Sequence, residues 1–200
     1  MTPASDHPDR GLRGAVKFVA LANLAYFGVE FAVALAIGSV ALFADSIDFL
    51  EDASVNALIL VALGWSVRSR GRLGMALAAL LLVPSLATLW MAWEKFAVPL
   101  PPAPVPLTLA GAGALAVNLT CAFVLARHRH RKGSLSKAAF LSARNDALAN
   151  VAIILAGFVT AFTLSAWPDL IVGLAIAAMN ATAAREVWEA ARAEKLEAEA

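Results

Sequence analysis

The residues of this chain best suited to chemistry are acidic side chains placed where a hydrophobic helix is expected. Within the apolar stretch 38–64 stand Asp45, Asp48, Glu51 and Asp52. An ionisable group in the hydrocarbon core of a bilayer is costly, roughly 2.5 to 3.5 kcal/mol per Asp on insertion scales. Such a cluster persists only where it faces other protein, water or a cation. We therefore treat it as a candidate functional site.

Helical geometry separates one of these acids from the others. At about 100° per residue, Asp48 lies about 60° from Asp45, and Asp52 lies about 20° from it. Asn56 continues the same stripe, whereas Glu51 projects from the flank. Like charges so close disfavour one another's ionisation unless protons or a cation are shared among them. A divalent cation meets that requirement directly.

A second polar stripe occurs in the apolar stretch LSARNDALANVAIILAG. Ser142, Asn145, Asp146 and Asn150 fall within an arc of about 140° on a helix, and Arg144 points away from Ser142, as a side chain reaching for the membrane boundary would. Two helices thus offer facing stripes rich in oxygen atoms. A carboxylate pair on one helix and a carboxylate with a polar neighbour on the other can form a four-coordinate metal site, which is able to release the metal when the helices shift.

Composition indicates where these helices lie. The chain has 200 residues, of which 60% are hydrophobic and 16% charged, with a mean hydropathy of +0.73. It is too apolar for an ordinary soluble domain, so we predict an all-α integral membrane protein. Six segments approach or exceed the roughly 20 residues needed to cross a bilayer as a helix. They are residues 14–37, 40–65, 73–93, 104–126, 136–163 and 167–186.

The distribution of basic residues predicts the orientation of this six-helix bundle. The connectors are short, and three basic clusters fall on one face of the predicted topology. The connectors on the opposite face contain Lys95 as their only lysine or arginine. The positive-inside rule therefore places both termini in the cytoplasm. The basic residues are Arg10, Arg13 and Lys17; Arg68, Arg70 and Arg72; and Arg127, Arg129, Arg131, Lys132 and Lys137.

The predicted domain organisation is simple. Residues 1–13 form a polar cytoplasmic tail, residues 14–186 the transmembrane domain, and residues 187–200 a short cytoplasmic tail that continues the last helix. A single cysteine, Cys121, excludes an intramolecular disulfide framework, and we interpret it as a packing residue.

Two motifs resemble those of the cation diffusion facilitator family. The run GSVALFADSIDFLEDA resembles the second span of that family, with its G-S-x-A-L-x-A-D opening and an Asp or His followed four positions later by Asp. Asp48 and Asp52 occupy that pair. The run SARNDALANVAIILAG resembles the fifth span, where the family commonly shows His-x-x-x-Asp; Asp146 matches the aspartate, and Ser142 stands in place of the histidine. The resemblance covers about residues 14–186.

This resemblance implies a function and a set of ligands. The family exports divalent transition-metal ions from the cytoplasm by proton-coupled alternating access, usually as a homodimer, and is not enzymatic. Asp48, Asp52 and Asp146 would be ligands of the transported ion, and no prosthetic group is expected. A serine hydroxyl is a poor zinc ligand, so the site at Ser142 suits a harder ion such as manganese or iron, or recruits Asn145, Asp45 or water. Zinc and cobalt stay candidates.

The resemblance also bears on assembly and location. Asn23 and Glu30 resemble polar positions of the family's first span. Many members append a soluble C-terminal metal-binding domain, whereas this chain stops soon after the sixth span, so we expect any homodimer to rest on membrane contacts, with the short helical tail as a second candidate contact. His128 and His130 lie in a basic loop whose positive charge we expect to set the topology.

We expect a multi-pass protein of a bacterial inner membrane whose partners are metal ions, protons and lipid, and not nucleic acid.

Three other interpretations stay open. The polar residues could simply knit the helices together, an interpretation that we weigh equally with a functional role for Asn23, Asn118, Asn150 and Asn180. A membrane enzyme could use clustered aspartates with a metal for phosphoryl transfer, although the D-x-x-D-G-x-x-A-R signature is missing. Finally, a transport-incompetent homologue could sense metal or scaffold a partner, which Ser142 would favour.

Overall fold

The computed structural model describes residues 7–62, 86–127 and 134–197, and every regular element within these ranges is a helix. The helices are α1 (His7–Ile37), α2 (Val40–Ala62), a helical segment 86–97, α4 (Pro104–Arg127), α5 (Ser134–Thr163) and α6 (Trp167–Glu197). Side chains outside the description within these ranges are those of residues 7–10, 59, 61–62, 134–144, 183–184 and 186–197.

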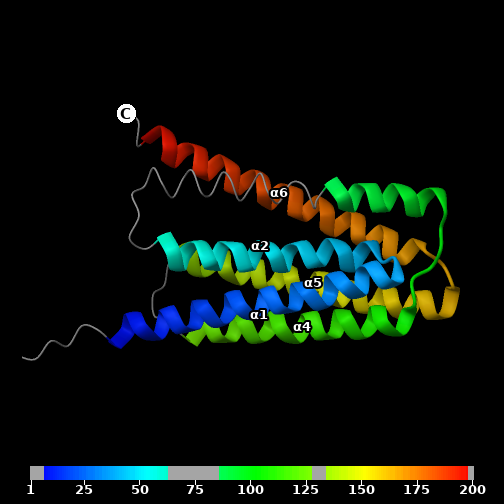
Figure 1. The fold of residues 1–200 in the computed structure, drawn as a ribbon, viewed down its shortest axis with the longest axis horizontal. Helices are drawn as coiled ribbons and strands as arrows, with labels where there is room; N and C mark the ends of the chain where they lie inside the picture. The colour runs from blue at the N-terminus through cyan, green and yellow to red at the C-terminus, as the bar shows by residue number, and fades with distance from the viewer. Residues whose placement is uncertain (1–6, 63–85, 128–133, 198–200) are drawn as a thin grey trace, which may run out of the picture.

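The helices form an elongated bundle. Figure 1 shows α1, α2, α4 and α5 running along its length, with α6 inclined across them. The start of α1 and the end of α6 lie at the same end of the bundle (Figure 1). We call this the terminal end, and the opposite one, where α1 turns into α2, the far end.

The predicted all-α bundle is confirmed for the described residues. Three helical stretches are long and apolar enough to cross a membrane, Gly11–Ile37, Pro104–Arg127 and Asn145–Thr163, and a shorter apolar one covers Trp167–Thr182. The helix α2 is not among them, because its acidic residues break the apolar window. Which side of the membrane the termini occupy stays a prediction.

At two places the helices extend clearly past the bounds that were predicted for them. Helix α1 begins at His7, inside the segment predicted as a tail. Proline is tolerated in the first turn of a helix, as at Pro8, and arginine and leucine favour a helix, although the charged residues there lower the hydropathy that marks a span. The segment 86–97 extends past the predicted end at residue 93, and residues 73–85 of that predicted span lie outside the described residues. Helix α6 reaches Glu197, as the predicted continuation requires.

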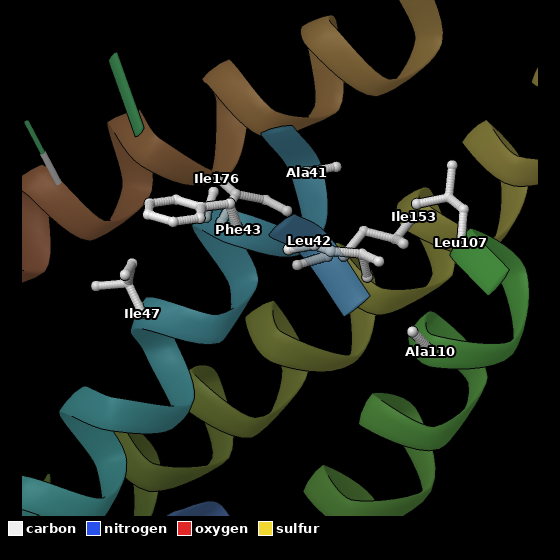
Figure 2. Packing of buried hydrophobic residues seen from close by; sticks show 11 residues of the cluster. Ala41, Leu42, Phe43, Ile47, Leu107, Ala110, Ile153 and Ile176 are labelled. Carbon is white, nitrogen blue, oxygen red and sulfur yellow. The ribbon is translucent and has the colours of Figure 1, made fainter. Parts of the chain in front are cut away.

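Helix α2 is the centre of the bundle. It contacts α1, α4, α5 and α6, and its side chains from residue 40 to 47 are all buried. Figure 2 shows the hydrophobic cluster around this part of α2, to which α1 also contributes Ala34. The labelled members are Ala41, Leu42, Phe43 and Ile47 of α2, Leu107 and Ala110 of α4, Ile153 of α5 and Ile176 of α6. This packing encloses the start of the acidic stripe of α2, at Asp45.

A two-residue turn joins α1 to α2. Gly38 adopts a φ of 64°, a left-handed conformation that glycine takes without steric cost. The Ser39 N–H then donates to the Ala34 carbonyl at 3.0 Å, which closes α1 in a Schellman arrangement. The Ser39 hydroxyl oxygen accepts from the Leu42 N–H at 3.1 Å and so caps α2. The resulting antiparallel hairpin brings Glu30 of α1 level with Asp45 of α2.

Candidate metal site

The acidic stripe of α2 changes its exposure along the helix. Asp45 has a relative exposure of 1%, whereas Asp48, Glu51 and Asp52 are each partly exposed. Asp45 lies nearer the far end, within the part of α2 that the hydrophobic cluster encloses. The stripe therefore opens toward the terminal end and is closed toward the far end.

Helix α5 brings Asp146 to this stripe. Asp146 is partly exposed, and its charge interacts with those of Asp48 and Asp52 across the interface between α2 and α5. Among the described residues, however, no three or more His, Cys, Asp and Glu side chains are grouped closely enough to hold a metal ion. Mutual repulsion of like charges opposes such a group. The ligand set of Asp48, Asp52 and Asp146 stays a prediction.

The other predicted ligands are placed less fully. Ser142 lies in α5 one turn before Asp146, and its side chain is outside the described ones. Asn145 is partly exposed on the same helix. Asn56, predicted to extend the stripe of α2, donates its Nδ2 to the Asp52 carbonyl at 2.8 Å and so bonds to its own helix instead. His128 and His130 lie outside the described residues.

Asp45 has a partner within the protein. The Asn150 Nδ2 of α5 donates to the Asp45 Oδ2 at 2.7 Å, and the Asn118 Nδ2 of α4 donates to the Asn150 Oδ1 at 3.1 Å. This chain of hydrogen bonds joins three helices and orients the Asp45 carboxylate. Asp45 is thus held differently from Asp48 and Asp52.

The remaining asparagines also connect helices. The Asn180 Nδ2 of α6 donates to the Ala44 carbonyl of α2 at 3.1 Å. The Cys121 Sγ of α4 donates to the Asn23 Oδ1 of α1 at 3.8 Å, which agrees with the interpretation of Cys121 as a buried packing residue. Such amide contacts are a common way to fasten helices in a membrane.

Sequence reasoning missed a second charged group, at the far end. Asp169, in the first turn of α6, is fully buried and accepts from the Val40 N–H at 2.9 Å and the Ala41 N–H at 3.2 Å. The Ser39 hydroxyl donates to the same carboxylate at 2.5 Å, and the Lys95 Nζ donates to it at 2.7 Å. We call Ser39, Lys95 and Asp169 the end clamp.

The end clamp satisfies the start of α2 completely. The first N–H groups of a helix have no partner within the helix; here Asp169 and the Ser39 hydroxyl accept from three of them, and the Ser39 carbonyl accepts from the Phe43 N–H at 3.2 Å. Lys95 also donates to the Gly38 carbonyl at 2.6 Å. Two signals in the sequence could have revealed this clamp. Lys95 is the single lysine of its connector, and Asp169 stands at the start of an apolar helix, so each charge needs a partner.

The family model described as the cation efflux transmembrane domain matches residues 16–193. This range contains the acidic stripe, Asp146 and the end clamp. No curated protein matches the chain.

Proposed function

Because this chain belongs to the cation efflux family, whose members are transporters of metal cations, we propose that it exports divalent transition-metal cations by alternating access coupled to protons. The family assignment identifies an integral membrane cation efflux transporter and disfavours the membrane-enzyme interpretation. The identity of the ion, the coupling to protons and the assembly as a homodimer in a bacterial inner membrane belong to the proposal.

The observation that carries the proposal is the convergence of carboxylates across two helices. Asp48 and Asp52 stand one turn apart on α2, and the charge of Asp146 on α5 interacts with both. Three carboxylates in one interface supply more negative charge than a membrane interior tolerates without compensation. A divalent cation provides that compensation, and its release needs only a change in the separation of α2 and α5.

The exposure of these side chains supports loading from the terminal end. Asp48, Asp52 and Asp146 keep some exposure, whereas Asp45 is buried and the end clamp ties α2 to α6 and to Lys95 at the far end. In the proposed cycle this arrangement is the inward-facing one. A cation would displace protons from the carboxylates, and protons would later compete it off on the other side.

The donor set supports a hard cation. Carboxylate, amide and hydroxyl oxygens are the ligands offered by Asp48, Asp52, Asp146, Asn145 and Ser142, and oxygen donors suit Mn²⁺ and Fe²⁺ better than they suit Zn²⁺. We therefore propose manganese or iron as the preferred cargo, with zinc and cobalt as competitors. In this proposal Ser142, one turn from Asp146, takes the place at which a histidine would favour zinc.

Transport by purified protein in liposomes tests the proposal. An encapsulated metal indicator and an encapsulated pH indicator report cation entry and proton exit in the same vesicles. We expect Asp52→Asn and Asp146→Asn to reduce both signals to the level of protein-free liposomes. The matched control is Glu51→Gln, which removes one charge from the same turn of α2 but from its flank, and it should keep transport.

The pattern of results separates the proposal from its rivals. Undiminished transport by Asp52→Asn or Asp146→Asn would refute the ligand assignment. Metal binding to the wild type without transport would instead support a sensor or scaffold. A Ser142→His variant that gains zinc preference would place residue 142 among the ligands.

A further inference from the structure

Glu30 is a carboxylate that the proposed transport site does not use. It lies in α1, its relative exposure is 0%, and neither Oε1 nor Oε2 has a hydrogen-bond partner among the described residues. An ionised carboxylate buried in this way is strongly unfavourable unless something compensates its charge. The compensating group has to be identified.

Glu30 is directed at the acidic stripe of α2. Its carboxylate is within hydrogen-bonding reach of the Asp45 carboxylate and also interacts electrostatically with Asp48. Asp45 is itself buried, and the Asn150 amide fixes its orientation from the other side. Two carboxyl groups from different helices thus meet, and neither oxygen of Glu30 accepts from an amide, hydroxyl or basic group of the described residues.

Two buried or partly buried side chains with donor groups, Tyr26 and Lys95, are engaged elsewhere. Tyr26, one turn before Glu30, donates its hydroxyl to the Ala110 carbonyl at 2.6 Å. Lys95, which is buried, donates to Asp169 and to the Gly38 carbonyl at the far end. Within the described residues no lysine or arginine forms an ion pair with Glu30 or Asp45.

We propose that Glu30 and Asp45 bind a second divalent cation, at a position between the transport site and the far end. Two carboxylates neutralise the charge of a divalent cation, and their oxygen atoms suit a hard ion such as Mn²⁺. Along α2, Asp45 is about 4.5 Å from Asp48 and about 10.5 Å from Asp52, from the rise of about 1.5 Å per residue. The inference rests on the proposed function, because it makes this pair the next position for a cation that has left the transport site toward the far end.

The test counts the cations bound per chain. Purified protein in detergent is dialysed against Mn²⁺, and bound Mn²⁺ is measured by elemental analysis and by its electron paramagnetic resonance signal. We expect two ions per wild-type chain, one for Glu30→Gln, one for Asp52→Asn and none for the double variant. Asp45→Asn provides a second variant of the pair if Glu30→Gln does not fold, and Gly28→Ala, on the exposed face of α1, serves as the folding control.

The outcomes distinguish this inference from the proposed function. Wild-type stoichiometry in both Glu30→Gln and Asp45→Asn would overturn the second position and leave the transport site intact. A wild type that binds one ion, lost in Asp52→Asn and kept in Glu30→Gln, would do the same. A wild type that binds none would overturn both sites. Loss of one ion in Glu30→Gln together with wild-type stoichiometry in Asp52→Asn would support the second position and refute the assigned transport ligands.

Discussion

Asp169 and Glu30 are both fully buried carboxylates directed at α2, yet the protein treats them in opposite ways. Asp169 accepts from two backbone N–H groups, a hydroxyl and a lysine. Glu30 meets another carboxylate and has no hydrogen-bond donor among the described residues. A buried charge that is fully compensated has a structural role, whereas one that lacks compensation needs a mobile partner. We infer that the far end of α2 is fixed and that its middle is built to exchange cations.

The largest expected effect is the loss of Asp169. In Asp169→Ala the Lys95 charge stays buried without its carboxylate, and the Val40 and Ala41 N–H groups lose their acceptor. Breaking a buried pair on one side costs about 3–5 kcal/mol. Thermal unfolding of the purified protein in detergent, followed by tryptophan fluorescence, should show a large fall in the melting temperature. A change as small as that of an exposed substitution would contradict the role of the end clamp.

A smaller effect is expected from closing the space in which α6 approaches α2. A Cβ atom added at Gly173 would lie 2.7 Å from the Val40 carbonyl carbon and 2.8 Å from the Ala41 nitrogen, and backbone atoms cannot move aside as a flexible side chain can. We expect Gly173→Ala to destabilise the protein by about 1–3 kcal/mol, because Asp169 loses its reach to the start of α2. Gly28→Ala is the matched control, since nothing lies within 4 Å of its added Cβ. Equal melting temperatures for the two variants would argue against a tight contact at Gly173.

The smallest effect has the opposite sign. In metal-free protein, Asp45→Asn removes one of two facing carboxylates, and the new amide can donate to Glu30 while its oxygen still accepts from Asn150. We expect a gain of about 1 kcal/mol, the usual net contribution of a hydrogen bond. The measurement is the melting temperature in the presence of a chelator. A clear loss of stability would mean that Asp45 has a structural role like that of Asp169, and the contrast between the two regions would disappear.

The sequence allowed the local features of this molecule to be predicted. The all-helical bundle follows from long apolar segments, and the acidic stripe follows from the period of the α-helix. The four-residue spacing of Asp48 and Asp52, and the separate run around Asp146, were recognisable as two family motifs because the residues within each motif are close in sequence. Hydropathy did not mark the polar first turns of α1, where helix propensity and apolar character diverge.

The contacts between distant residues could not be predicted in the same way. Lys95 and Asp169 are separated by 74 residues, and Asp45 and Asn150 by 105. Neither pair belongs to a periodic pattern, so only the packing of the helices brings the partners together. Glu30 was visible as a polar position in the first span, but its meeting with Asp45 depends on the two-residue turn at Gly38, which sets the alignment of α1 against α2.

That turn also determines which helices can move as one body. Sliding of α1 along α2 would break the hydrogen bonds that end one helix and begin the other at Ser39. Helices α2 and α5 touch in far fewer places than α1 and α2 do, so displacement is easier between them. A cation held by Asp48, Asp52 and Asp146 would therefore lie across the interface that can part. A cation held by Glu30 and Asp45 would move together with α1 and α2. Its coordination by these two residues would stay unchanged when α2 and α5 separate.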